Sequence, residues 1–224
     1  GTVFFGTGDG LYALDASNGK QKWPHYNAKA GVVTSPSVIG NVVYFGSGDQ
    51  KVYALDTTTG EPLTSIWGTG RKAGRVVGGD FVSNMVASGD GLYFVSADQA
   101  LRCVSASSAT PRWAVRINSA SASATPTVAG ENLYLTAGDL IYCFRAQNGQ
   151  TRYTMNIGSE SASGVGVDDE GNAYVVNGDR MLVAVSPRGR PLWKTPPQLE
   201  HEAISAPTVS GNTIIVGTVL GGVY

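Results

Sequence analysis

Short apolar runs alternate with turn residues along the whole chain. In one stretch the runs occupy residues 37–39, 42–45 and 52–55, and a weaker run starts at Pro62. They are rich in Val, Ile, Tyr and Phe, and Gly, Asn, Asp and Pro separate them, which is the pattern of β-strands joined by tight turns. No window shows the apolar period of an amphipathic helix. The pattern therefore predicts an all-β protein.

The runs recur at a nearly fixed interval. Equivalent positions are held by Tyr12, Tyr53, Arg102, Tyr142, Val183 and Tyr224, at steps of 41, 49, 40, 41 and 41 residues. Four strands per unit of about forty residues is typical of a β-propeller blade. We expect four-stranded antiparallel blades, about five repeats plus a partial sixth, in one propeller domain or propeller segment over residues 1–224.

The two ends of the chain fall at different strands of the repeat, and this indicates how many blades a closed ring would have. The chain opens on a second-strand run and closes on the second and third runs of a sixth copy. This redundancy favours a segment of a seven- or eight-bladed ring. A five-bladed ring with an overhanging tail is the alternative.

The turns between the runs have recognisable chemistry. Pairs such as Gly40-Asn41 at the first hairpin, and Gly48-Asp49 and Gly178-Asp179 at the next, are expected to supply positive φ. Asp15 and Asp56 precede turn glycines and are expected to hold turn amides. A metal site built from such aspartates is disfavoured, because carboxylates spread one per blade do not converge.

An aromatic residue follows four positions after most turn glycines. We expect these side chains to lie as wedges between neighbouring blades, each removing roughly 150–250 Å² from water. The alternative is an aromatic platform for a ligand. The predicted wedges are Trp23, Trp113, Tyr153 and Trp193.

Composition narrows the functional classes. Charged residues make up 15% of the chain and the net charge is −1, so the basic face expected of a nucleic-acid-binding protein is missing. No apolar run reaches the length of a membrane-spanning helix, and no signal peptide is visible. Cys103 and Cys143 occupy the same place in successive copies, too far apart for a disulfide, and are expected to be buried small apolar residues.

Two stretches look like metal-binding motifs but lack the residues that those motifs need. The run from His201 to Ser205 begins like a zinc-protease motif but lacks the second His. The stretch from Asp168 to Asn172 could hold a cation, yet it lacks the alternating ligands of an EF-hand loop. We interpret it as an acidic exposed hairpin.

The clearest departure from the repeat is an insertion around residues 68–75. It is glycine-rich and carries three positive charges on a sparsely charged chain, and charged loops on rigid scaffolds often serve recognition. Three residues at equivalent places in other blades are expected to share its rim, as a contact site for an acidic partner or ligand. A merely solvated loop is the alternative. The candidate rim consists of Arg71, Lys72, Arg75, Glu160, His201 and Glu202.

The repeat resembles the quinoprotein-type propeller repeat, whose pattern V-Y-A-L-D-x-x-x-G-x-x-x-W is seen from Leu11 through Gly19 to Trp23. The resemblance covers essentially the whole chain and implies the propeller fold. Its implication for function is open, because the repeat occurs both in dehydrogenases and in non-catalytic scaffolds such as the outer-membrane assembly lipoproteins.

The dehydrogenase branch implies pyrroloquinoline quinone, calcium and a converging set of Asp, Glu and Asn residues. The segments leading into the first strands are where such residues should lie, and here they are small and nearly uncharged. No vicinal Cys pair is present either. We therefore assign no catalytic, cofactor-binding or metal-binding residue.

Three functional hypotheses remain. The leading one is a non-catalytic propeller scaffold that binds a protein or another ligand in the periplasm or outside the cell. The second is a fragment of a pyrroloquinoline quinone-dependent alcohol or sugar dehydrogenase. The third is an extracellular sensor domain of a signalling protein.

Overall fold

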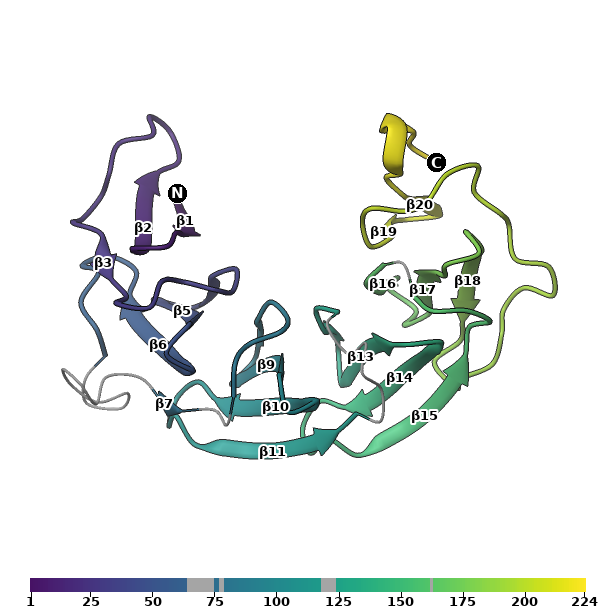
Figure 1. The fold of residues 1–224 in the computed structure, drawn as a ribbon, viewed down its shortest axis with the longest axis horizontal. Coiled ribbons are helices and arrows are strands. Elements are labelled where there is room, and N and C mark those ends of the chain that lie inside the picture. Colours follow the sequence, from purple (N-terminus) through teal and green to yellow (C-terminus); the bar gives the residue numbers. More distant parts are fainter. Residues whose placement is uncertain (64–74, 77–78, 118–123, 162) are drawn as a thin grey trace. The chain divides into compact units, whose positions relative to one another are not determined.

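A computed structural model describes residues 1–63, 75–76, 79–117, 124–161 and 163–224. The described residues form six antiparallel sheets of two to four strands, one for each sequence repeat and the partial sixth (Figure 1). The all-β prediction is confirmed. The chain divides into two compact units, Gly1–Arg116 and Ile117–Tyr224.

The first unit contains three sheets, and in each one consecutive strands are neighbours. Their strands are β1 (Thr2–Gly6), β2 (Gly10–Asp15) and β3 (Tyr26–Asn27); β4 (Ser37–Ile39), β5 (Val42–Ser47), β6 (Lys51–Asp56) and β7 (Arg75–Val76); β8 (Val86–Ser88), β9 (Gly91–Ser96), β10 (Ala100–Ser105) and β11 (Pro111–Arg116).

The second unit continues the same order with a four-, a three- and a two-stranded sheet. Its elements are β12 (Thr127–Ala129), β13 (Asn132–Ala137), β14 (Leu140–Arg145) and β15 (Thr151–Asn156); β16 (Gly166–Val167), β17 (Ala173–Val176) and β18 (Leu182–Val185); β19 (Thr208–Ser210), β20 (Thr213–Ile215) and the 3₁₀ turn η2 (Val219–Gly221).

The strand register repeats from sheet to sheet. The first strand of the second repeat pairs Ser37 with Tyr44, and that of the fourth pairs Thr127 with Tyr134. A β-bulge follows Cys103 in β10 and recurs after its equivalent Cys143 in β14. The sequence repeat is therefore a repeat of backbone structure.

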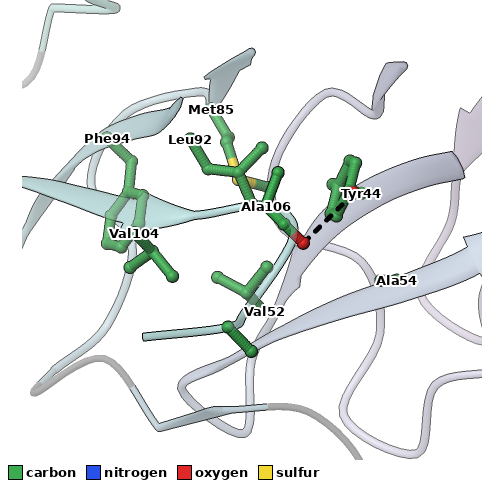
Figure 2. Packing of buried hydrophobic residues seen from close by; sticks show 9 residues of the cluster. Tyr44, Val52, Ala54, Met85, Leu92, Phe94, Val104 and Ala106 are labelled. Atoms are coloured by element: carbon green, nitrogen blue, oxygen red, sulfur yellow. Dashed lines mark hydrogen bonds between the residues drawn. The ribbon is translucent and has the colours of Figure 1, made fainter. Parts of the chain in front are cut away.

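Within each unit, the apolar core forms between consecutive sheets. Val52 and Ala54 of the second sheet pack with Leu92 and Phe94 of the third, and all four are at most 2% exposed (Figure 2). The hydroxyl of Tyr44 crosses this interface and donates to the Ala106 carbonyl at 3.4 Å (Figure 2). Neighbouring sheets of one unit thus pack face to face, as layered β-structures require.

The turn predictions are confirmed in part. Gly40 has φ +56° at the first hairpin, as predicted. At the next hairpin the prediction for Gly48 and Gly178 is wrong, because Gln50 and Arg180 take the positive φ there, each at +65°. Position 48 requires glycine for a different reason: a Cβ atom there would lie 2.6 Å from the Ala30 carbonyl oxygen.

The turn aspartates behave as predicted. Asp15 accepts the Ser17 amide at 2.8 Å, and Asp56 accepts the amides of Thr58 and Thr59 at 2.8 and 2.9 Å. These backbone hydrogen bonds favour the ionised carboxylate and lower the pKa of Asp56.

The acidic hairpin is also organised by a carboxylate. Asp168 accepts hydrogen bonds from the amides of Glu170 and Asn172 and from the Tyr174 hydroxyl. Burial alone would raise the pKa of Asp168, but these hydrogen bonds and one from the Asn172 side chain outweigh it, and its pKa is lowered. The carboxylate therefore serves the hairpin itself.

Both cysteines are unpaired and fully buried, as predicted. Burial raises the pKa of each thiol to about 11. A thiol with so high a pKa holds little thiolate near neutral pH, so neither residue is suited to act as a nucleophile.

Candidate functional site

A repeated hydroxyl group fixes the segments that lead into the first strand of each sheet. The side-chain oxygens of Thr34 and Ser83 accept the backbone N–H of Gly46 and Val95, both at 2.9 Å. The same bond recurs in the second unit, where Ser163 accepts from Val176 and Ser205 from Gly217, both at 3.2 Å.

Sequence reasoning noted that these segments are small and uncharged but missed this role. The signal was a Ser or Thr at the same phase of four copies: Thr34, Ser83, Ser163 and Ser205. Because these oxygens already accept a backbone hydrogen bond, their role is structural: they hold the segment against the second strand of the same sheet. Residues that could bind a ligand or partner are therefore sought among the positions that differ from repeat to repeat.

The segments of the fifth and sixth repeats lie side by side in the second unit. A Cβ atom added to Gly164 would lie 3.3 Å from the Cβ of Ala206. Between them opens a pocket of about 330 Å³, to which Glu160 contributes the charged group and Ile204 an apolar side chain that is 68% exposed. The pocket combines one carboxylate, several hydroxyls and an apolar surface. Its remaining lining residues are Ala124, Thr136, Ala137, Gly138, Ser161, Ser163, Gly164, Ser205 and Ala206.

Three members of the candidate rim belong to these segments. The Glu160 carbonyl accepts the Gly178 amide at 2.7 Å, and the Glu202 carbonyl accepts the Val219 amide at 2.9 Å. Both glutamate side chains are exposed and His201 is half-buried. The backbone at both glutamates is thus fixed while their carboxylates face solvent.

The basic members of the candidate rim belong to the first unit. Arg71 and Lys72 lie outside the described residues. Arg75 starts β7, and its backbone pairs with Val52 of β6. The structure therefore brings Glu160 and the segment next to Glu202 together, and it places Arg75 in a separate unit.

Two of the four predicted wedge aromatics lie against the turn glycine of the next repeat. Trp23 is 5% exposed and packs with Val43, Phe45 and other residues of the second sheet. A Cβ atom at Gly60 would lie 2.5 Å from its indole ring. Tyr153 and Gly189 repeat this contact, again at 2.5 Å.

The other two aromatics contact a tyrosine of their own repeat. Trp113 lies 6.0 Å from the Tyr93 ring and Trp193 lies 5.9 Å from the Tyr174 ring, measured between ring centroids. Both Trp side chains are half-buried.

A quinone and calcium site would need ligands that converge on one point. Calcium needs several converging oxygen ligands, and no group of three or more His, Cys, Asp or Glu side chains gathers among the described residues. The aspartates instead hold their own turns, as Asp56 and Asp168 do. The described part of the chain does not fit that cofactor, and we derive no step through it.

Comparison with known proteins shows which family the chain belongs to. The sequence profile described as "Outer membrane protein assembly factor BamB" matches residues 1–67, 64–144 and 138–224, which together span the chain. The chain belongs to the BamB family.

Solved structures show the same fold. BamB from Moraxella catarrhalis superposes with a TM-score of 0.72 at 20% identity, over 100% of this chain and 72% of the BamB chain. The computationally designed protein Ika8 gives 0.77 at 16% identity, over 99% of this chain and 66% of its own. The chain thus has the fold of the greater part of a BamB propeller.

Two further searches, one of curated sequences and one for membrane-spanning helices among the described residues, find nothing. A comparison with curated protein sequences gives no significant match. In the part of the chain that the structure describes, no helix is long and apolar enough to cross a membrane.

Proposed function

We propose that this chain is a non-catalytic propeller scaffold that binds a protein partner in an extracytoplasmic compartment, in the service of outer-membrane protein assembly. Membership of the BamB family is the observation that carries the proposal. We further propose that both compact units belong to one propeller domain over residues 1–224.

We propose Glu160, His201 and Glu202 of the candidate rim as a contact surface on the second unit, and Arg71, Lys72 and Arg75 as a separate contact segment of the first. The backbone at the two glutamates is held by hydrogen bonds from the Gly178 and Val219 amides, so the backbone there needs little ordering on binding. The neighbouring pocket adds the exposed Ile204. An apolar centre with charged groups around it is the usual composition of a protein contact surface.

The chemistry of the described residues argues against the dehydrogenase alternative. Among the described residues, no three His, Cys, Asp or Glu side chains come together as they would to hold a metal ion. The buried thiols are held protonated by burial. No specific observation favours the sensor-domain hypothesis.

The test is made in the organism that carries the protein. Its gene is deleted, and the level of correctly folded outer-membrane β-barrel proteins is measured in isolated membranes. Plasmids then supply the natural protein, a variant carrying Glu160→Lys with Glu202→Lys, and a control carrying Glu170→Lys. Glu170 is an exposed glutamate of the acidic hairpin, so the control makes the same kind of charge change elsewhere.

We expect the deletion to lower the level of these barrel proteins and the natural protein and the control to restore it, whereas the rim variant restores it poorly. Unchanged barrel levels after deletion would contradict the assembly role. Stoichiometric binding of added pyrroloquinoline quinone with calcium, together with dye reduction by alcohols, would overturn the non-catalytic proposal.

A further inference from the structure

The third sheet carries an arginine where other sheets carry a tyrosine. In the second sheet this position holds Tyr53, whose hydroxyl donates to the Asp49 carboxylate of the neighbouring turn at 2.7 Å. In the third sheet Arg102 of β10 makes the same kind of contact, because it donates to the Asp98 carboxylate and, through Nε, to the Ser96 hydroxyl at 2.8 Å. A guanidinium group has five N–H donors. Arg102 therefore holds its turn and keeps donors for a further contact.

A second arginine lies diagonally across from Arg102 on the same face of the sheet. Arg102 of β10 is paired with Ala114 of β11, and Ala100 is paired with Arg116. Diagonal neighbours on one face of a sheet are roughly 7–8 Å apart, which is within reach of long side chains. Arg116 is exposed and Arg102 is half-buried. The two guanidinium groups can therefore reach one ligand.

Both arginines line a pocket of about 560 Å³ on β10 and β11, the two outermost strands of the third sheet (Figure 1). The other lining residues are Ala97, Asp98, Gln99, Ala100 and Ala114. Three of these are alanines, whose short side chains leave room beside the guanidinium groups. Two arginines and one aspartate give the pocket a single net positive charge.

Arg116 differs from its neighbour Arg112 on the same strand. Arg112 forms an ion pair with Asp90. Among the described residues of the first unit, no carboxylate forms an ion pair with Arg116. In the fourth sheet the same position holds Asn156, whose side-chain amide donates to Asp139 at 2.6 Å. The charge of Arg116 is thus not neutralised within its own sheet.

The rest of the first unit does not supply the missing negative charge. Every Asp and Glu of this unit lies among the described residues, and the insertion at 64–74, which lies outside them, contains neither. The first unit carries more Lys and Arg than Asp and Glu, whereas the second carries fewer. In the chain, four-stranded sheets come both before and after the third sheet. The complementary charge is therefore expected from another molecule.

We propose that this pocket binds an aspartate or glutamate side chain of a partner polypeptide. A carboxylate accepts paired N–H donors from an arginine, and such charge-assisted bonds are roughly twice as strong as neutral ones. One carboxylate matches the single net charge of the pocket, whereas a phosphate dianion would exceed it. Recognition of acidic motifs by arginine clusters is a general mode of peptide binding. The inference rests on the proposed function only in taking the partner to be a polypeptide.

The probe is the capped tripeptide acetyl-Ala-Glu-Ala-amide, added to isotope-labelled protein at about pH 6, where a glutamate is still ionised. The control is the same peptide with Gln in place of Glu. Binding is followed by NMR through the Nε–H signals of the arginine side chains. We expect the Glu peptide to shift the signals of Arg102 and Arg116 in a saturable manner, and the Gln peptide to leave them in place.

A pair of variants assigns the effect to the pocket. Arg116→Gln removes one of the two guanidinium groups from an exposed position. We expect it to weaken binding at least about tenfold, the loss expected for one hydrogen bond to a charged group. The matched control is Arg145→Gln, because Arg145 is an exposed arginine outside the pocket. The control should bind the peptide as the natural protein does.

Equal shifts with the two peptides, or an unchanged affinity in Arg116→Gln, would overturn the proposal, and so would an absence of saturable shifts. Tighter binding of inorganic phosphate than of the Glu peptide would assign the pocket to phosphate groups and also contradict the proposal. These measurements use the isolated protein, so their failure would leave the deletion test of the assembly role standing. The two proposals can therefore fail separately.

Discussion

The contact between Trp23 and Gly60 allows a quantitative test of the wedge hypothesis. Trp23 is 5% exposed, and its indole N–H donates to the Thr57 carbonyl at 3.3 Å. Burying an indole removes roughly 150–250 Å² from water, worth about 4–6 kcal/mol at about 25 cal/mol per Å². Truncations of large core aromatics cost about 3–5 kcal/mol. We therefore expect Trp23→Ala to lower the free energy of unfolding by about 3–5 kcal/mol.

The partner substitution is Gly60→Ala. Gly60 has φ +74°, and an L-residue in that region costs roughly 1–2 kcal/mol. The new Cβ would also lie 2.5 Å from the indole ring, and overpacking of this kind adds about 1–3 kcal/mol. In the protein that already carries Trp23→Ala the collision disappears, so only the backbone cost remains.

Gly19 supplies a matched control within the same unit. It has φ +70°, yet a Cβ atom there meets no atom within 4 Å. Gly19→Ala should therefore cost only the backbone term and add to the effect of Trp23→Ala without coupling.

The assay is urea unfolding of the single and double variants, with the midpoint and slope fitted for each. We expect a coupling of about 1–3 kcal/mol between Trp23→Ala and Gly60→Ala, in the direction of relief, and near-additivity for the Gly19 pair. Equal costs for Gly60→Ala in both backgrounds would refute the reasoning. So would a loss below about 1 kcal/mol for Trp23→Ala, far short of a core truncation.

Three further predictions concern other elements. Thr34→Ala should lower the free energy of unfolding by about 1–3 kcal/mol in urea titrations, because the buried Gly46 N–H loses its acceptor; Thr34→Ser should keep most of it, and equal losses in the two variants would contradict the hydroxyl role. The Asp168 carboxylate has a lowered pKa in the folded protein. The stabilisation it gives is therefore present above its pKa in the unfolded chain, about 3.9, and is lost as the pH falls through its pKa in the folded protein. Asp168→Asn should be less stable than the natural protein at pH 7, and thermal unfolding should show this difference in stability closing below about pH 4. A thiol reagent should leave Cys103 and Cys143 unmodified in the native state and label both after unfolding without reductant; labelling in the native state would contradict their burial.

Sequence reasoning reached the fold through local chemistry. Turn aspartates such as Asp56 and the repeat period depend on residues close in the chain, so pattern and turn preferences were enough. The positive φ of Gln50 and Arg180 was missed, because the sequence does not show which of several turn residues must reverse the chain.

The sequence suggested that aromatic side chains lie between repeats, but it did not show which residues they contact there. Ala109 takes the place of the turn glycine, with φ +55° and 1% exposure. The preceding repeat carries Thr64 instead of an aromatic at the wedge position. Only the folded chain shows that the aromatic of one repeat lies against the turn glycine of the next, as Trp23 lies against Gly60.

Site-specific photo-crosslinking in living cells tests the central claim most directly. A photoreactive amino acid is placed at Glu160 or Glu202 of the candidate rim, or at Asp169 on the exposed acidic hairpin as the control. The account predicts an adduct with a defined outer-membrane assembly protein from the rim positions and none from Asp169. Absence of a protein adduct from both rim positions, in cells whose barrel assembly depends on this protein, would contradict it.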